Sequence, residues 1–377
     1  MQCSYFDSGA CRSCTLMGTE YASQVADKQE QCRALLAAYP NVRWLSPVTS
    51  VEHDFRNKAK MVVGGSVTSP TLGILDSERN GIDLRRCGVL QPGLRDALPP
   101  ISHFISLARI EPYDVEARRG ELKYVLLTEA TSGELMLRFV LRSREAISRI
   151  RKHLPELQHS LPRARVISVN LQPEHKAIIE GEQEIMLTPR STLTMKAGDI
   201  DLHLGAKSFF QTNTAVAEHL YAQARRWSAQ VGPRSVWDMY CGVGGFALHL
   251  ADGERSVTGI EVSPEAIESA TASANDARLA NIRFVAADAT QFALGSRPED
   301  VPDLVVVNPP RRGVGPKLAE WLEKSSVSTV IYSSCNATTL ATDLAAMPSL
   351  SPVRAQVLDM FPQTRHYETM VLLERNG

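Results

Sequence analysis

The chain has 377 residues, of which 44% are hydrophobic and 22% charged, an ordinary composition for a soluble globular protein of two or three domains. The net charge of −1 excludes recognition of nucleic acid by bulk electrostatics, so such a partner would be bound by local basic patches. No apolar run reaches the ~20 residues of a membrane span. No basic segment leads into an apolar core at the N-terminus, so we expect no signal peptide, no membrane association and a cytoplasmic location.

The first predicted part, residues 1–90, holds five of the seven cysteines. An odd number of cysteines in a reducing compartment argues against a disulfide framework. Cys3, Cys11 and Cys14 form a C-x7-C-x2-C group, and Cys87 stands alone further on. Four thiolates could hold an iron–sulfur cluster or a structural zinc ion, although zinc favours two close pairs or a histidine; unconnected thiols remain the third reading. Cys32 lies in a helical pattern and is expected in the core.

Residues 55–65 predict a strand with Arg56, Lys58 and Lys60 along one edge, which suits either a solvated face or contact with phosphates. The second predicted part, residues 91–205, is an α+β region. We expect antiparallel strands at 122–127 and 135–141, a helix over 143–154 that ends before Pro155, a strand at 166–171, and joints at Pro99-Pro100 and Pro173. Seven basic residues between 142 and 165 form either a solvated face or an RNA-contacting surface: Arg142, Arg144, Arg149, Arg151, Lys152, Arg163 and Arg165.

The third predicted part, residues 206–377, alternates helices and strands. The predicted strands are 235–241, 256–262, 282–287, 304–308, 329–334, 354–359 and 367–373, and the predicted helices are 215–229, one from 245, 263–279, 317–325 and 337–346. This alternation predicts a doubly wound, Rossmann-like sheet that binds its ligand at the C-terminal ends of the strands.

A glycine turn at 240–245 links the first of these strands to the next helix. Gly242 and Gly244 allow the backbone to turn through positive φ and to approach a ligand closely. The turn lacks the full spacing of a nicotinamide-binding turn and is more like that of S-adenosylmethionine enzymes.

Polar residues stand where the later strands end. Glu261 closes the second strand, 19 residues after Gly242, where an acidic side chain suits a ribose diol. Asp288, Asn308 and Cys335 close the third, fourth and fifth strands, and Glu368 stands on the last. A thiolate that adds to C6 of a pyrimidine makes C5 nucleophilic, and a base then removes the C5 proton. Alone, Cys335 could be a small core residue and Glu368 a surface charge; together with the glycine turn they favour methylation of a pyrimidine carbon.

Five motifs, FFQTN at 209–213, DMYCGVG at 238–244, NPPRRG at 308–313, SSCN at 333–336 and HYE at 366–368, resemble in this order the motif set of the RNA uracil-C5 methyltransferases. The resemblance covers essentially the whole chain. It implies Cys335 as nucleophile and Glu368 as general base. It also implies contacts to S-adenosylmethionine and a 4Fe–4S cluster. The expected cofactor residues are Gln211, Tyr240, Gly242, Gly244, Glu261, Asp288 and Asn308, and the expected cluster ligands are Cys3, Cys11, Cys14 and Cys87.

Two positions depart from the family pattern. Asn308 stands where many members have Asp, so we expect it to form hydrogen bonds and to transfer no proton. The gap between Cys3 and Cys11 is longer than in many members.

The substrate implied by the resemblance is RNA. The chain starts almost at the cluster cysteines, without the N-terminal β-barrel of longer relatives, and this short form is similar to the members that modify a uridine of the 747 type in 23S rRNA. The alternatives are a tRNA uracil-54 enzyme, a methyltransferase of small molecules or proteins with a structural Cys335, and a non-catalytic iron–sulfur RNA-binding protein. We expect 23S rRNA as partner and no obligate protein partner.

Overall fold

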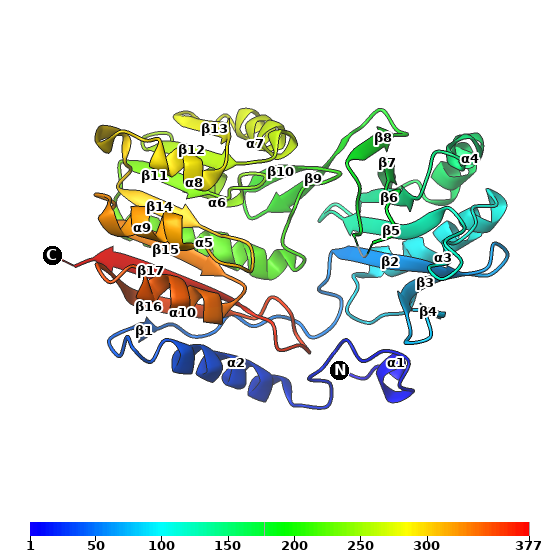
Figure 1. Ribbon diagram of the computed structural model, residues 1–377, viewed down its shortest axis with the longest axis horizontal. Helices are drawn as coiled ribbons and strands as arrows, with labels where there is room; N and C mark the ends of the chain where they lie inside the picture. Colours follow the sequence, from blue (N-terminus) through cyan, green and yellow to red (C-terminus); the bar gives the residue numbers. More distant parts are fainter. Residues whose placement is uncertain (177, 377) are drawn as a thin grey trace. The chain divides into compact units, whose positions relative to one another are not determined.

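The computed structural model describes residues 1–176 and 178–376, and the chain forms two compact units (Figure 1). The first unit combines residues 1–14 with 52–195, and the second combines 15–51 with the chain from 196 onward. These bounds differ from the predicted parts 1–90, 91–205 and 206–377. The difference arises because residues 58–65 pair with the middle region in one sheet, whereas residues 21–35 form a helix that packs against the C-terminal sheet.

The second unit is built on an eight-stranded sheet with the order β1-β16-β17-β15-β14-β11-β12-β13. The strands are β1 (Arg43–Trp44), β11 (Ser235–Met239), β12 (Ser256–Glu261), β13 (Ile282–Ala286), β14 (Leu304–Val307), β15 (Thr329–Ser334), β16 (Leu350–Leu358) and β17 (Glu368–Arg375). The pairs from β13 through β15 are parallel, and β17 runs antiparallel to both of its neighbours. The predicted doubly wound α/β sheet is therefore confirmed, with one reversed strand.

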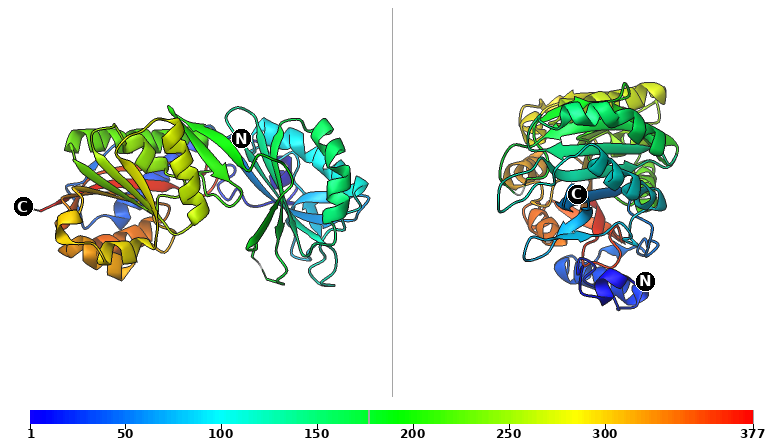
Figure 2. Two further views of the ribbon diagram at one scale, coloured as in Figure 1. Left: turned by 90° about the horizontal axis from the view of Figure 1, so that it is seen from above. Right: turned by 90° about the vertical axis from the view of Figure 1, so that its right-hand side faces the viewer.

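Helices cover both faces of this sheet (Figure 2, left). They are α2 (Tyr21–Leu35), α5 (Thr214–Val231), α6 (Gly245–Leu250), α7 (Pro264–Asp276), α8 (Ala289–Leu294), α9 (Pro316–Lys324) and α10 (Ala337–Ala345). Helices α2, α8, α9 and α10 share one buried hydrophobic core with the sheet. That α2 belongs here, although it lies about 200 residues upstream of β11, was not predicted.

The first unit holds a seven-stranded sheet with the order β4-β3-β2-β5-β6-β7-β8. Its strands are β2 (Lys58–Gly65), β3 (Pro70–Leu75), β4 (Gly81–Asp83), β5 (Leu122–Glu129), β6 (Leu135–Leu141), β7 (Ala164–Leu171) and β8 (Gln183–Met186); its helices are α1 (Ser4–Asp7), α3 (Pro92–Leu107) and α4 (Ile147–Ser160). The predicted antiparallel pair at 122–127 and 135–141 is confirmed. A further two-stranded sheet joins β9 (Thr192–Ala197) to β10 (Ile200–Gly205), and the division between the units falls within β9.

Two proline predictions are wrong. Helix α4 continues through Pro155 to Ser160, and α3 contains both Pro99 and Pro100. A proline inside a helix costs about 3 kcal/mol. Each buried Leu, Ile or Phe side chain returns about 1.5–3 kcal/mol, and the two helices contribute Leu98, Ile101, Phe104, Ile105 and Leu157 to the core. Tertiary packing thus outweighs the local penalty. Within the described residues, no helix is long and apolar enough to span a lipid bilayer.

Candidate active site

A cavity of about 700 Å³ opens at the C-terminal edge of the parallel strands of the second unit. It brings together most of the residues that the sequence singled out: Gln211, Tyr240, Gly242, Glu261, Asp288, Asn308, Cys335 and Glu368. Of the predicted catalytic and cofactor residues, Gly244 alone is not in the lining. Polar residues that end separate parallel strands meet at one sheet edge, which is why Tyr240 and Cys335, 95 residues apart in the chain, share one cavity.

The glycine turn after β11 has the strained backbone that its sequence predicts. Tyr240, Gly242 and Gly244 have φ values of 67°, 54° and 85°. A Cβ atom on Gly244 would lie 3.0 Å from the Phe284 ring, closer than ordinary van der Waals contact, and the positive φ disfavours any other residue at this position. Gly244 therefore shapes the turn without lining the cavity, whereas Gly242, which has open space around it, lines the cavity.

Two carboxylates are fixed at neighbouring strand ends by backbone donors. The Gly242 N–H donates to Glu261 Oε2 at 3.2 Å, and the Ser263 N–H donates to Glu261 Oε1 at 3.0 Å. Asp288 accepts the Gln291 N–H at 2.9 Å and caps helix α8. Backbone donors therefore hold both acidic side chains in fixed positions at the cavity.

Glu368 is the first residue of β17 and is 2% exposed. Because β17 is antiparallel to β15, its first residue lies at the same edge as the C-terminal end of β15. Glu368 Oε1 accepts the Ser333 hydroxyl at 2.5 Å and the Asn308 amide at 3.1 Å. Burial raises the pKa of Glu368 to about 7, against the opposing effect of these two hydrogen bonds. A carboxyl with a pKa near neutrality can both accept and release a proton.

Asn308 directly follows β14, and its amide nitrogen donates to the Ser333 carbonyl as well as to Glu368, at 3.1 Å each. A carbonyl oxygen only accepts, so it fixes the orientation of the amide. This matches the hydrogen-bonding role expected for Asn308.

Cys335 directly follows β15, and its side chain is partly exposed. Burial and the charge of Glu368 raise the pKa of its thiol, and the guanidinium of Arg311 lowers it through charge and a hydrogen bond. The thiol and the carboxyl thus belong to one electrostatic unit, with Arg311 as the group that favours the thiolate.

Sequence reasoning assigned no role to Ser333 or Arg311. Both stood within quoted motifs, but only the neighbouring strand explains why Ser333, rather than Ser334, reaches Glu368. The sequence also predicted no role for Asp238. This residue is buried, does not line the cavity, and holds the turn by accepting the Ala247 N–H at 2.8 Å. Burial raises the pKa of Asp238 to about 7.

The four predicted cluster cysteines all lie in the first unit. Burial, followed by the charges of Cys87, Cys11 and Cys3, raises the pKa of the Cys14 thiol to about 11. The four sulfur atoms are thus near enough to influence one another. Within residues 1–176 and 178–376, however, no set of three or more histidine, cysteine or acidic side chains has the arrangement that holds a metal ion.

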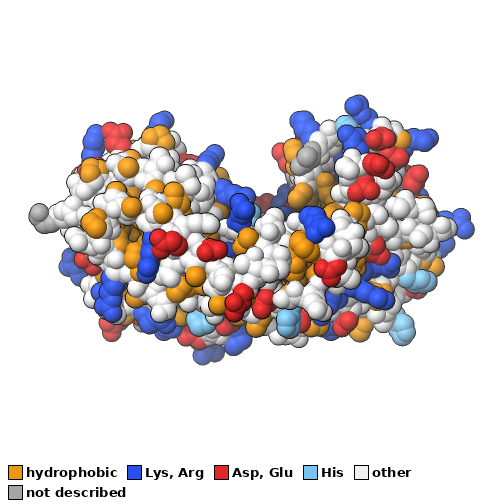
Figure 3. All heavy atoms as spheres, turned by 90° about the horizontal axis from the view of Figure 1, so that it is seen from below, with side chains coloured by type: hydrophobic (Ala, Val, Ile, Leu, Met, Phe, Trp, Pro, Cys, Tyr) orange, Lys and Arg blue, Asp and Glu red, His pale blue; other side chains and the backbone are white. Residues whose placement is uncertain are grey.

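Most of the basic residues between 142 and 165 are paired with carboxylates. The ion pairs are Arg142–Glu121, Arg149–Glu145, Arg163–Glu129 and Arg165–Glu134. Arg144, Arg151 and Lys152 remain exposed around the start of α4. On the face drawn in Figure 3, Lys and Arg side chains are interspersed with those of Asp and Glu. The basic run is therefore largely a set of local ion pairs.

The strand order with one reversed strand, the glycine turn and the acidic residue at the next strand end define a Rossmann-like methyltransferase domain. The model of the tRNA (uracil-5-)-methyltransferase family matches residues 129–376. The chain belongs to this family.

Individual proteins are similar over their full length. The 23S rRNA (uracil(747)-C(5))-methyltransferase RlmC of Halothiobacillus neapolitanus is 50% identical to this chain, and the alignment covers 100% of both chains. The enzyme of the same name from Yersinia enterocolitica is 47% identical, with 99% of each chain covered. Among solved structures, this chain is similar to the tRNA (uracil-54, C5)-methyltransferase of Pyrococcus abyssi in complex with S-adenosyl-L-homocysteine. The TM-score is 0.79 and the sequence identity is 25%, and the superposition covers 96% of this chain and 84% of the Pyrococcus abyssi chain.

Proposed function

We propose that this protein transfers a methyl group from S-adenosylmethionine to C5 of a uridine in 23S rRNA, the uridine of the 747 type. The observation that carries the proposal is one cavity that holds a partly exposed thiol, a buried carboxyl of near-neutral pKa and a glycine turn. Full-length similarity to enzymes named for this reaction supports the choice of 23S rRNA over other RNAs.

Cys335 acts as the nucleophile. Its thiolate forms a bond from Sγ to C6 of uracil, and the electron pair of the C5–C6 double bond moves toward O4 and makes C5 nucleophilic. Arg311 favours the thiolate because its guanidinium lowers the pKa of Cys335. When bound, S-adenosylmethionine supplies the electrophilic methyl group that C5 accepts.

Glu368 acts as the general base after methylation. Its carboxylate removes the C5 proton, the C5–C6 double bond forms again, and the bond between Sγ and C6 breaks to release the thiolate. Ser333 and Asn308 hold the carboxylate oxygen in place through their hydrogen bonds. Overall, a methyl group replaces one hydrogen, which leaves as a proton on Glu368.

The cofactor is held by the residues around the glycine turn. Glu261 binds the ribose hydroxyls. Each of its two oxygens accepts one hydrogen bond from a backbone N–H and has a second lone pair with which to accept a hydrogen bond from a hydroxyl. Gln211, Tyr240, Gly242, Asp288 and Asn308 complete this site, and Gly244 gives the turn its shape. The acidic lining suits a ligand that carries a positive sulfonium and a ribose diol.

The exposed cations of the first unit bind the RNA backbone. Arg144, Arg151 and Lys152 have no carboxylate partner in the part of the chain that the structure describes, in contrast to the paired arginines of the same run. Phosphate contacts of this kind position RNA without reading its sequence.

We further propose that Cys3, Cys11, Cys14 and Cys87 hold a 4Fe–4S cluster. The effect of Cys87, Cys11 and Cys3 on the pKa of Cys14 supports it, because the four thiols are close together and each would bind iron as a thiolate and release its proton to solvent. The cluster would hold the N-terminal segment in place, and no step at Cys335 requires redox chemistry.

Anaerobic purification tests the cluster. We expect brown protein with a broad visible absorbance band, equal iron and sulfide, and loss of both in Cys14→Ser. Cys32→Ser is the matched control, because Cys32 is buried in the second unit. Stoichiometric zinc without sulfide would assign a zinc site instead, and protein with neither metal would remove the proposal.

The function is tested with purified protein, tritiated S-adenosylmethionine and two RNA transcripts, a 23S rRNA fragment with the target uridine and a tRNA T-arm. We expect label in the 23S fragment alone, and none when the target uridine is replaced by cytidine. Label in the T-arm alone would identify a tRNA uracil-54 enzyme. No label in either RNA would favour a non-catalytic RNA-binding protein. Mass mapping of rRNA from cells without the protein locates the uridine independently.

A further inference from the structure

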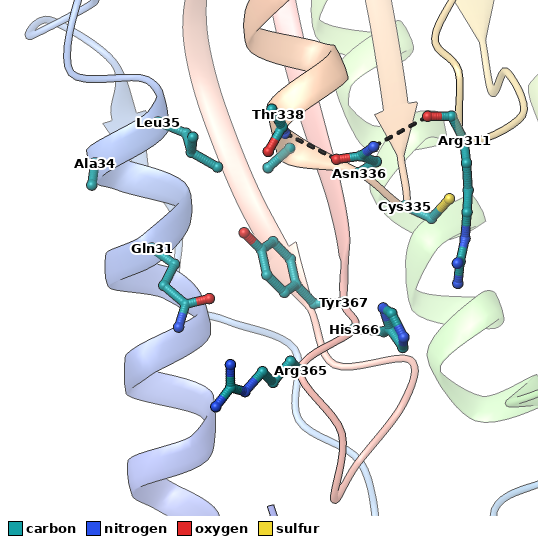
Figure 4. A pocket seen from close by; sticks show the side chains of 11 residues that line it. Gln31, Ala34, Leu35, Arg311, Cys335, Asn336, Thr338, Arg365, His366 and Tyr367 are labelled. Carbon is teal, nitrogen blue, oxygen red and sulfur yellow. Dashed lines mark hydrogen bonds between the residues drawn. The ribbon is translucent and has the colours of Figure 1, made fainter. Parts of the chain in front are cut away.

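A second cavity of about 590 Å³ lies beside the first in the second unit (Figure 4). It extends between α2, which contributes Gln31 and Leu35, and the start of α10. Cys335 and Arg311 line both cavities, and so does His366. The nucleophile therefore stands in the wall between two spaces, only one of which contains the proposed cofactor residues.

The chemical character of the second cavity differs from that of the first. Its described lining includes Arg311 and Arg365 and no carboxylate, whereas the first cavity is lined by three acidic residues, Glu261, Asp288 and Glu368, in addition to Arg311 and Arg312. The ring of Tyr367 lies between α2 and Cys335 in Figure 4 and is 9% exposed. A fixed aromatic ring beside exposed cations suits a nucleobase joined to a phosphate.

The walls of this cavity are held in place. Asn336 caps α10 by accepting the Thr338 N–H at 3.1 Å, and its amide donates to the Arg311 carbonyl at 3.2 Å. Leu35, at the end of α2, is 41% exposed despite being apolar. Arg365 is exposed and forms no ion pair in the described part of the chain, so its guanidinium is available to an external anion.

We infer that the second cavity binds the nucleotide next to the target uridine, with its base against Leu35 and Tyr367 and its phosphate on Arg365. This inference rests on the proposed function. Consecutive nucleotides are joined by one phosphodiester, so a uridine bonded to Cys335 in the first cavity places its neighbour across the shared wall. The base in the second cavity is unstacked from its neighbours in single-stranded RNA, the form in which proteins recognise RNA bases. Helix α2 is thereby a specificity element of the methyltransferase unit.

The test uses hairpin RNAs that carry the target uridine, either intact or with an abasic residue at its 5′ or its 3′ side. We expect the wild type to lose about tenfold in kcat/KM when the base on one of these two sides is missing. The kcat/KM of Leu35→Asp should fall about tenfold on intact RNA. On the abasic RNA that slows the wild type, Leu35→Asp should be nearly as active as the wild type, because both changes remove the same contact. Arg365→Gln should lose several-fold with a weaker salt dependence.

Arg234→Gln is the matched control. Arg234 is 93% exposed and precedes β11, at the sheet edge opposite the strand ends that form the cavities. It should behave as wild type, and all variants should bind S-adenosylhomocysteine equally. Equal losses for Leu35→Asp on intact and abasic RNA, activity of both variants within twofold of wild type, or weakened cofactor binding would overturn the inference. A wild-type protein that methylates no RNA would instead refute the proposed function.

Discussion

The two cavities on either side of Cys335 differ in charge although they share a wall. Both are lined by two arginines, but only the first also has three carboxylates, each fixed by hydrogen bonds, whereas the second has a partly apolar floor and no carboxylate in its described lining. This difference favours a cationic cofactor on one side of the sulfur atom and an anionic nucleic acid on the other. Arg311 belongs to both linings, so the charge that favours the thiolate also faces the RNA side.

Burial sets the protonation of Glu368 in the first cavity. Glu368 is buried among hydrogen bonds that favour its charged form, yet burial prevails and raises its pKa to about 7. His366, which lines both cavities, is exposed, and its pKa is lowered by partial burial and by the charges of Arg311 and Lys28. The proton acceptor therefore belongs to the cofactor side, where the C5 proton is to be removed.

The largest effect is expected from removal of the shared sulfur. Cys335→Ala should lower methyl transfer on the order of 10⁴-fold or more, since C5 of uracil is not nucleophilic without the bond to C6. Binding of S-adenosylhomocysteine should persist, because Cys335 only borders the first cavity. Filter assays with tritiated cofactor and calorimetric titration measure the two quantities. Methyl transfer to RNA at more than a few per cent of the wild-type rate would exclude covalent catalysis.

Glu368→Gln should reduce turnover about 10²- to 10⁴-fold, the usual contribution of a general base. The methylated RNA should stay bonded to Cys335, because the C5 proton is not removed, and denaturing electrophoresis with labelled RNA measures this adduct. Glu374→Gln is the control, since Glu374 is exposed at the far end of the same strand. Normal turnover of Glu368→Gln, or loss of turnover without an adduct, would assign the base elsewhere.

Glu261→Gln tests the cofactor side alone. Hydrogen bonds to a charged group contribute about 1.5–3 kcal/mol, so affinity for S-adenosylhomocysteine should fall about 10- to 100-fold. Affinity for the RNA hairpin should not change. Glu265→Gln is a suitable control, because Glu265 is exposed on the first turn of α7. Equal loss of RNA and cofactor binding would show that the two cavities do not act separately.

The sequence predicted the parts of this site that depend on local signals. A glycine turn, alternating helices and strands, and polar residues at strand ends placed Glu261, Asp288, Asn308 and Cys335 at one edge, because parallel strands all end there. The role of Ser333 depended on the register between β15 and β17, which a single sequence does not encode locally.

Helix α2 shows why the second cavity was not predicted. Its inward face carries Gln24 and Lys28, which are 0% and 2% exposed, so a hydrophobic pattern would assign that face to solvent. Lys28 is instead paired with the buried Asp359 at 2.7 Å, 331 positions away in the chain. Buried polar groups with distant partners give no periodic signal, so the assignment of residues 15–51 to the second unit required the structure.

The smallest predicted effect concerns the pH dependence of the first cavity. For the wild type, kcat/KM should rise with pH through about 7, because Glu368 must be ionised to accept the C5 proton. In Asn308→Asp, a carboxylate would replace the amide that donates to Glu368, so the pKa of Glu368 should rise and the profile should move about one unit to higher pH. Asn275→Asp, an exposed change on α7, should leave the profile where it is.

Asn308→Asp should also change the stability of the folded protein, and the raised pKa of Glu368 determines how this change depends on pH. The folded-state pKa of Glu368 is raised, so its contribution to stability is present below the unfolded pKa of ~4.3 and is lost as pH rises through about 7. Asn308→Asp adds a second acid to the same buried site, so the melting temperature relative to wild type should fall more at pH 8 than at pH 5. A profile that moves to lower pH, or a destabilisation that is larger at pH 5, would mean that Glu368 is ionised throughout and that the carboxyl on the cofactor side is not held near neutrality by burial.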